Sequence, residues 1–318
     1  MRKLFLHIGT HKTGTTSLQT TLSAHRLFLN QHGYYYPTAG VPAGLAAQHN
    51  LAWELSQDAR FQGKNGMVTD LWDEIANKPY DVIVSSEDFE CAIYRNPDKV
   101  AEFVHMLGDR GFQVIIVVYL RNQVEYIRSL FLELLKHGYT EAFETFLNVG
   151  LKAGIIHWKH WVFPLDYDVF LDRLRGIHSG SIVVRSYDRM GCSVIDDFFH
   201  ILNLVPIASD IDTAIRLNQQ LSLAESFALF CQNRQGLPVD QAVVSDLFAR
   251  EDMVDFSSRT KTRILDRFHN SNLSVCNTNG VLPFELKAGE SASFDGKLAR
   301  TFDDIFSAEL AAMSTDHN

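Results

Sequence analysis

The chain has 318 residues, 46% of them hydrophobic, and a formal net charge of −9. A chain of this length can bury a substantial core, and the acidic balance disfavours binding to nucleic acid or to a long polyanion. The N-terminus lacks the apolar region and cleavage site of a signal peptide, and no apolar run is long enough to span a bilayer, so we expect a cytoplasmic protein without a membrane span.

Strand-like and helical segments alternate along the first part of the chain. Strands are expected at residues 4–8, 81–86, 114–120 and 181–184, and helices at residues 15–30, 43–57, 97–110 and 122–137. This alternation is typical of a parallel sheet wrapped by helices, in which ligands bind at the carboxyl ends of the strands.

The last part of the chain has a helical pattern. Helices are expected there at residues 195–204, 221–232, 241–249 and 260–268. We therefore expect one domain over residues 1–318, with an α/β core at residues 1–190 and a helical region at residues 191–318. Two separate domains are the alternative.

The stretch at residues 7–17 follows the first expected strand and opens the first expected helix. Gly9 and Gly14 keep the G-x4-G spacing of a nucleotide-binding P-loop, in which backbone N–H groups point at phosphate oxygens beside the positive end of a helix. Two threonines follow Gly14, however, and the loop's one lysine, Lys12, lies inside it. The usual lysine after the second glycine is missing, which does not suit a γ-phosphate and magnesium site.

A second candidate phosphate ligand follows the apolar run at residues 114–120. Arg121 stands where that expected strand ends, and an amphipathic helix follows it. Ser129 lies off the apolar stripe of this helix, on the face that points back towards the strand end. The planar fork of the Arg121 guanidinium suits a dianionic phosphate.

Together these two motifs resemble those of the sulfotransferases that use 3'-phosphoadenosine 5'-phosphosulfate (PAPS), and bacterial members above all. The string H-K-T-G-T-T-S resembles their 5'-phosphosulfate loop, including that of the heparan N-sulfotransferase branch, and an arginine with a serine eight residues later resembles their 3'-phosphate motif. The resemblance covers about residues 1–190 and implies a P-loop NTPase-like fold. The cofactor-binding residues that it implies are His11, Lys12, Thr13, Gly14, Thr15, Thr16, Ser17, Arg121 and Ser129.

The resemblance also implies an activity. A sulfuryl group would pass from PAPS to a hydroxyl or amine of a carbohydrate or small-molecule acceptor, leaving 3',5'-adenosine bisphosphate, without a metal. Such an in-line displacement requires a group that neutralises the charge on the leaving phosphate and a group that takes a proton from the acceptor. Lys12 suits the first task, unless it is a solvent-facing loop lysine. We interpret His11 as a loop-shaping residue rather than a catalyst.

Two residues compete for the role of the base. Glu87 follows an expected strand at the correct edge of the sheet, where partial desolvation could raise its pKa to a useful value. The alternative for this segment is helix capping, with Ser85 or Ser86 as the cap and the acids facing a helix start. His49 is the rival because imidazole titrates near neutrality, although a buried structural histidine fits as well. Members of the resembled family use either residue type, so the choice stays open.

Two other functions remain as alternatives. An ATP-dependent kinase of the same architecture would need magnesium and a conventional P-loop lysine, and a nucleotide-sensing module would bind the nucleotide without turnover. His157 and His160 share a helix-like i, i+3 spacing that could bind a metal, but they lack a third ligand or a nearby carboxylate, so we favour a structural role for them and expect no metal site. The four cysteines lack C-x-x-C spacing and predict reduced thiols.

Overall fold

The computed structural model describes residues 1–204, 221–236, 255–280 and 301–307. These residues fall into two compact units. The first comprises residues 1–121, 156–204 and 271–280, and the second comprises residues 122–155, 221–236, 255–270 and 301–307. The helix expected at residues 241–249 lies outside the described residues. Within the described ranges, no helix combines the length and the apolar character needed to cross a membrane.

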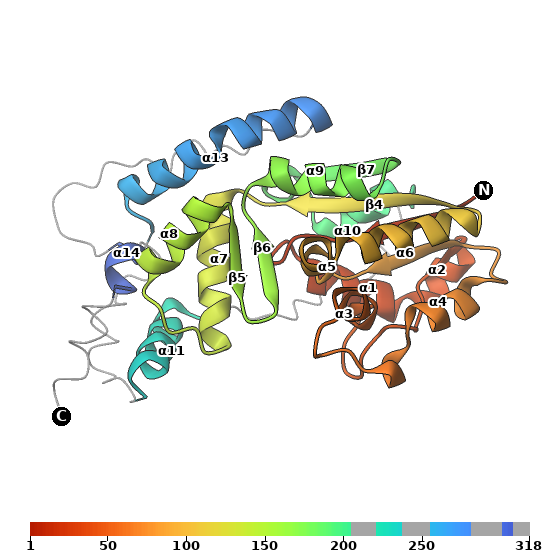
Figure 1. Ribbon diagram of the computed structural model, residues 1–318, viewed down its shortest axis with the longest axis horizontal. Coiled ribbons are helices and arrows are strands. Elements are labelled where there is room, and N and C mark those ends of the chain that lie inside the picture. Colours follow the sequence, from red (N-terminus) through yellow and green to blue (C-terminus); the bar gives the residue numbers. More distant parts are fainter. Residues whose placement is uncertain (205–220, 237–254, 281–300, 308–318) are drawn as a thin grey trace. The chain divides into compact units, whose positions relative to one another are not determined.

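The described part of the first unit is built on a five-stranded parallel sheet with the order β2-β3-β1-β4-β7. Figure 1 shows two of its neighbouring strands, β4 and β7, side by side. Its strands are β1 (Arg2–His7), β2 (Tyr34–Tyr35), β3 (Asp81–Ser85), β4 (Phe112–Leu120) and β7 (Ser181–Ser186). Strand β1 lies at the centre, with Leu4 opposite both Val82 and Val114. The predicted α/β fold, a parallel central sheet flanked by helices, is confirmed.

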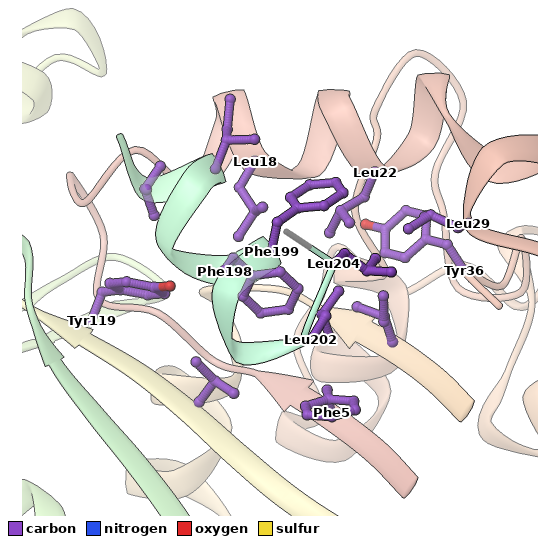
Figure 2. Packing of buried hydrophobic residues seen from close by; sticks show 14 residues of the cluster. Phe5, Leu18, Leu22, Leu29, Tyr36, Tyr119, Phe198, Phe199, Leu202 and Leu204 are labelled. Carbon is purple, nitrogen blue, oxygen red and sulfur yellow. The ribbon is translucent and has the colours of Figure 1, made fainter. Parts of the chain in front are cut away.

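One face of this sheet is covered by α1 (Thr15–Ala24), α2 (Arg26–Gln31) and α10 (Val194–Ile201). Figure 2 shows side chains of α1 and α10 meeting those of the strands in one apolar cluster, whose labelled members include Phe5, Leu18, Leu22, Tyr119, Phe198 and Phe199. The single helix expected at residues 15–30 is therefore two helices. They meet at His25, whose ring Nδ1 bonds the carbonyl of Thr21 at 2.9 Å, so the side chain competes with the helical backbone there.

Alternate residues along each strand point to the opposite face of the sheet. On this face α6 (Pro97–Asp109) packs on β4, and α9 (Tyr167–Ile177) packs on α6. Pro97 starts α6 with a backbone angle that is already helical. The remaining elements of this part of the chain are α3 (His49–Ser56), η1 (Gly63–Asn65), α4 (Val68–Ile75), α5 (Phe89–Arg95) and η2 (Tyr187–Arg189). The helix expected from residue 43 starts only at His49, because a turn between Pro42 and Leu45 precedes it.

A hairpin of β5 (Ile155–Trp158) and β6 (Trp161–Pro164) packs beside α5. It corrects one sequence interpretation. His157 lies on β5 and His160 lies in the turn between the strands, so their spacing is not that of a helix. The stacked indoles of Trp158 and Trp161, with centroids 5.6 Å apart, close the hairpin across this turn.

The described part of the second unit is helical. It contains α7 (Gln123–Lys136), α8 (Phe143–Ala153), α11 (Leu223–Gln235), α14 (Phe302–Ile305) and the first residues of α13 (Ser258–Asn279), which continues into the first unit. Its core is a cluster of phenylalanines. The ring centroid of Phe131 lies within 5.3 Å of the ring centroids of Phe143, Phe146 and Phe306. Every regular element described after residue 191 is a helix, as the sequence pattern predicts.

Candidate active site

The loop between β1 and α1 continues the pairing of the sheet. Ile8 N donates to Val117 O at 3.0 Å, and Thr10 N donates to Tyr119 O at 3.2 Å, so the chain stays attached to β4 beyond the end of β1. The hydroxyl of Thr13 donates to the carbonyl of Thr10 at 2.6 Å, and both threonines are fully buried. The side chain of Thr13 therefore shapes the loop.

The glycines of this loop leave no room for a side chain. A Cβ on Gly9 would lie 2.8 Å from Thr15 Cγ2, and one on Gly14 would lie 2.9 Å from Val194 Cγ1. Gly14 also has a φ of 75° and stands at the N-cap of α1 without a side-chain cap. The start of α1 lies at the carboxyl edge of the sheet, where Thr15 is buried and Thr16 is exposed. The N-terminus of a helix is a position that favours negative charge.

Lys12 and Arg121 meet at this edge. Lys12 adopts a left-handed backbone with a φ of 64°, and its carbonyl accepts a hydrogen bond of 3.1 Å from Arg121 Nη1. The Arg121 guanidinium also lies 3.6 Å from Asp188 Oδ1 and 5.6 Å from the ring centre of Tyr187. Ser129 is buried on α7, in the second unit. Its joint use with Arg121 on a 3'-phosphate stays a prediction.

The segment after β3 carries the acidic residues of the site. Ser86 N donates to His7 O at 3.0 Å, which fixes this segment beside the loop between β1 and α1. The carboxylate of Glu87 accepts a hydrogen bond of 2.7 Å from Gln19 of α1. Ser86 Oγ accepts from Asp88 N at 3.2 Å, so the serine caps a turn, whereas within the described residues neither acid caps α5 with its side chain. This contact pattern leaves Glu87 available as a candidate base.

His49, at the start of α3, lies at the same strand end. Its Nδ1 atom is 2.8 Å from Ser86 Oγ and 3.4 Å from Asp88 Oδ2, and its ring stacks on Trp53 with centroids 5.8 Å apart. The structure therefore brings both candidate bases, which are 38 positions apart in the printed sequence, to the carboxyl end of β3.

His11 turns its ring towards α5. Its Nδ1 bonds Glu90 Oε1, its Nε2 lies 3.8 Å from Asp88 Oδ1, and its edge meets the ring of Phe163. Glu90 is fully buried. Because both ring nitrogens face carboxylates, the side chain of His11 ties the loop to α5, which fits a loop-shaping role.

The acids and histidines of this cluster stabilise one another's charged forms. Burial alone would lower the pKa of His49 and raise that of Glu87, but the opposite charges prevail: Glu87 and Asp88 raise the pKa of His49, and His49 and His11 lower the pKa of Glu87. In the same way, Glu90 outweighs burial and raises the pKa of His11 to about 9. The expectation that desolvation raises the pKa of Glu87 is therefore wrong, because the neighbouring histidines outweigh burial. The lowered pKa favours the ionised form of Glu87, and the raised pKa of His49 favours its cationic form.

Several residues of the site were missed by the sequence interpretation. Trp53 and Arg60 both contact Asp88, and Glu90 binds His11. Two signals were present: Trp53 lies four positions after His49 on an expected helix, where side chains meet, and Glu90 is an acid in an otherwise apolar segment. Arg60 left no such signal.

No group of three or more His, Cys, Asp or Glu side chains in the described ranges could hold a metal ion. The four cysteines are free thiols, and Cys91 and Cys231 are buried.

No family model matches the chain, and no curated protein matches it. Among solved structures, a sulfotransferase from Alicyclobacillus acidocaldarius is 18% identical over 79% of this chain and 97% of its own, with a TM-score of 0.41. A structure from the PezAT toxin-antitoxin system of Streptococcus pneumoniae is 13% identical over 84% of this chain and 88% of its own, with a TM-score of 0.32. Because both TM-scores are low, we infer the function from the residues of this chain alone.

Proposed function

We propose that the protein is a sulfotransferase that moves a sulfuryl group from PAPS to a hydroxyl or amine of a carbohydrate or small-molecule acceptor. One observation carries this proposal. The phosphate loop has its lysine, Lys12, inside the loop instead of after Gly14, and the ionised Glu87 lies at the end of the neighbouring strand β3. An anion cradle beside a carboxylate base suits a transfer from a phosphate to a protonated nucleophile.

The roles follow the charges that change during the reaction. The acceptor oxygen or nitrogen forms a bond to sulfur while the bond from sulfur to the 5'-phosphate oxygen breaks, and 3',5'-adenosine bisphosphate leaves. The loop N–H groups and the start of α1 hold the 5'-phosphate, and Lys12 neutralises the charge that develops on the leaving oxygen. Arg121 holds the 3'-phosphate. No metal is assigned a role.

The proton of the acceptor passes to Glu87. A base must be unprotonated before the reaction, and among the two candidates Glu87 meets this condition at neutral pH, because its pKa is lowered by His49 and His11 despite its burial. His49, with its pKa raised by Glu87 and Asp88, would act as a cation beside the transferring group. The free thiols fit a reducing, cytoplasmic setting.

A binding comparison and a transfer assay test this proposal. In thermal unfolding, 3',5'-adenosine bisphosphate at a hundred times its Kd should stabilise the protein by about 2.7 kcal/mol, and magnesium ATP should stabilise it less. Sulfur-35 from labelled PAPS should appear on at least one acceptor in a panel of sugars, phenols and amines. Stabilisation by magnesium ATP alone would indicate a kinase, and bisphosphate binding without labelling of any acceptor would indicate a nucleotide-binding module.

A further inference from the structure

The carboxylate of Asp88 collects donors from three parts of the chain. Its Oδ2 atom accepts a hydrogen bond of 2.7 Å from Trp53 Nε1, lies 3.5 Å from Arg60 Nη1 and lies 3.4 Å from His49 Nδ1. Its Oδ1 atom lies 3.8 Å from His11 Nε2, and only 6% of the side chain is exposed. Burial alone would raise the pKa of Asp88. The neighbouring cations and N–H donors outweigh burial and hold this pKa below its ordinary value, so the carboxylate stays ionised.

His49 also contacts Trp53 through its ring face, and Arg60 lies over the indole of Trp53. The imidazole lies parallel to the indole of Trp53, with 14° between the ring planes. The guanidinium of Arg60 lies 4.7 Å from the centre of Trp53 and 5.7 Å from that of Trp161, while its Nε bonds Asp58 at 3.0 Å. Arg60 is therefore fixed by Asp58 and by the two indole rings. Its guanidinium in turn restricts the positions of Trp53 and Asp88.

We propose that Asp88 is the positioning residue of His49, held in place by Trp53 and Arg60, and that this set orients the imidazole for sulfuryl transfer. The inference rests on the proposed function. With Nδ1 facing Asp88 and Ser86, the proton on that nitrogen is fixed and Nε2 is the nitrogen that serves the reaction. A protonated Nε2 donates a hydrogen bond to oxygens that gain charge in the transition state.

The charged groups that face His49 come from three segments. Glu87 and Asp88 follow β3, His11 belongs to the phosphate loop, and Arg60 follows α3 and reaches His49 through Asp88. Glu87 and Asp88 favour the imidazolium, whereas His11 disfavours it. Removing the charge of Asp88 should therefore lower the pKa of His49 while Glu87 still supports the cation.

Three substitutions test the positioning role. Asp88→Asn keeps the shape and removes the charge, and Trp53→Phe keeps an aromatic ring beside His49 but removes the Nε1–H donor. Trp161→Phe is the matched control, because Trp161 contacts Arg60 through its ring and phenylalanine keeps a ring there. The readouts are the titration of His49 by NMR, assigned with His49→Asn, the affinity for 3',5'-adenosine bisphosphate by calorimetry, and turnover with labelled PAPS.

We expect Asp88→Asn to lower the pKa of His49, to change which ring nitrogen carries the proton in the neutral form, and to reduce kcat by at least about tenfold with nucleotide affinity unchanged. Trp53→Phe should also lower the pKa of His49 and kcat, but by less than Asp88→Asn does. Trp161→Phe should match the wild type in both quantities. If Asp88→Asn does not fold, Trp53→Phe carries the test alone.

Unchanged titration of His49 in a folded Asp88→Asn or Trp53→Phe protein overturns the positioning role. So does an equal loss of turnover in Trp161→Phe, because that loss would come from the stack and not from the carboxylate. The NMR readout does not depend on turnover. A wild-type protein that transfers no sulfuryl group, yet shows the shifted His49 titration, would remove the proposed function and leave the contact between Asp88 and His49 established.

Discussion

Arg121 Nη1 donates a hydrogen bond to the carbonyl oxygen of Lys12 at 3.1 Å. The bond connects the end of β4 to the loop that follows β1, two adjacent parallel strands. Lys12 is one of the few described residues other than glycine with a positive φ, a conformation that disfavours side chains with a Cβ atom. Arg121 thus supports the backbone of the same residue whose ammonium we assign to the leaving group, so its substitution should affect both the loop and the ligand.

Arg121→Ala should weaken binding of 3',5'-adenosine bisphosphate by about 2 to 5 kcal/mol, because a desolvated phosphate loses its charged partner. Calorimetry on the folded variant measures this loss. Arg110→Ala is the matched control, because Arg110 precedes β4 at the opposite edge of the sheet and lies over the ring of Trp72. Wild-type affinity in a well-folded Arg121→Ala protein would show that Arg121 does not bind the 3'-phosphate.

Lys12→Ala and Lys12→Gly should both abolish most sulfuryl transfer to every acceptor, since each lacks the ammonium. Glycine accepts the φ of 64° without strain, so Lys12→Gly should keep its free energy of unfolding within about 1 kcal/mol of the wild type. Labelled PAPS measures transfer, and chemical denaturation measures stability. Near-normal transfer by the glycine variant would assign Lys12 a backbone role only.

Gly14→Ala should destabilise the protein by about 3 kcal/mol, from the positive φ and from the contact of its Cβ with Val194. Gly191→Ala separates the two causes, because Gly191 has a φ of 70° but open space around its Cβ, and should lose only about 1 kcal/mol. Adding Val194→Ala to Gly14→Ala should recover part of the loss. Equal destabilisation by the two glycine substitutions would mean that the contact with Val194 contributes nothing.

The pH dependence of kcat distinguishes the two candidate bases. His49 has a raised pKa, so its ring is protonated below that value and loses the proton as the pH rises through it. If Glu87 is the base and His49 acts as a cation, kcat with a sugar acceptor falls as the pH rises through this range. If His49 is the base, kcat rises there. At the acid end, activity should persist to below the ordinary pKa of glutamate, because His49 and His11 outweigh burial and lower the pKa of Glu87.

Two variants complete that comparison. Glu87→Gln should retain nucleotide binding and lower turnover by a factor of about a hundred or more at every pH. His49→Asn should remove the alkaline limb of the profile. Full turnover in Glu87→Gln, together with an inactive His49→Asn that still binds the nucleotide, would assign the base role to His49.

The sheet could be predicted because its strands are short, buried apolar runs. The ranges predicted for two strands, residues 114–120 and 81–86, match β4 and β3 to within two residues at either end. Strand β2 has only two residues and α5 has seven, so both are shorter than the segments over which hydrophobic periodicity is read, about four residues for a strand and about eleven for a helix. The hairpin of β5 and β6 was hidden because its indoles and histidines repeat at a spacing that also fits a helix.

The candidate site could be predicted only where its residues are close in sequence. The loop between β1 and α1 is one contiguous motif, in which Gly9 and Gly14 both lie too close to neighbouring side chains for a Cβ and Gly14 also has a positive φ. The contacts of Asp88 come instead from Trp53 and Arg60, which are 35 and 28 positions away. Those contacts depend on how α3 packs against α5, which periodicity does not encode.

The central position of β1 has a consequence for how the chain folds. His7 bonds Ser85 across 78 positions, and Thr10 bonds Tyr119 across 109 positions, so the loop between β1 and α1 is anchored at both sides by segments that are synthesised much later. Long chain segments must be closed before these contacts form, which slows folding. During synthesis the loop therefore has no fixed shape until β4 has emerged. A nucleotide added early to a refolding protein would find no site, and its binding would appear only with the slowest step that completes the sheet.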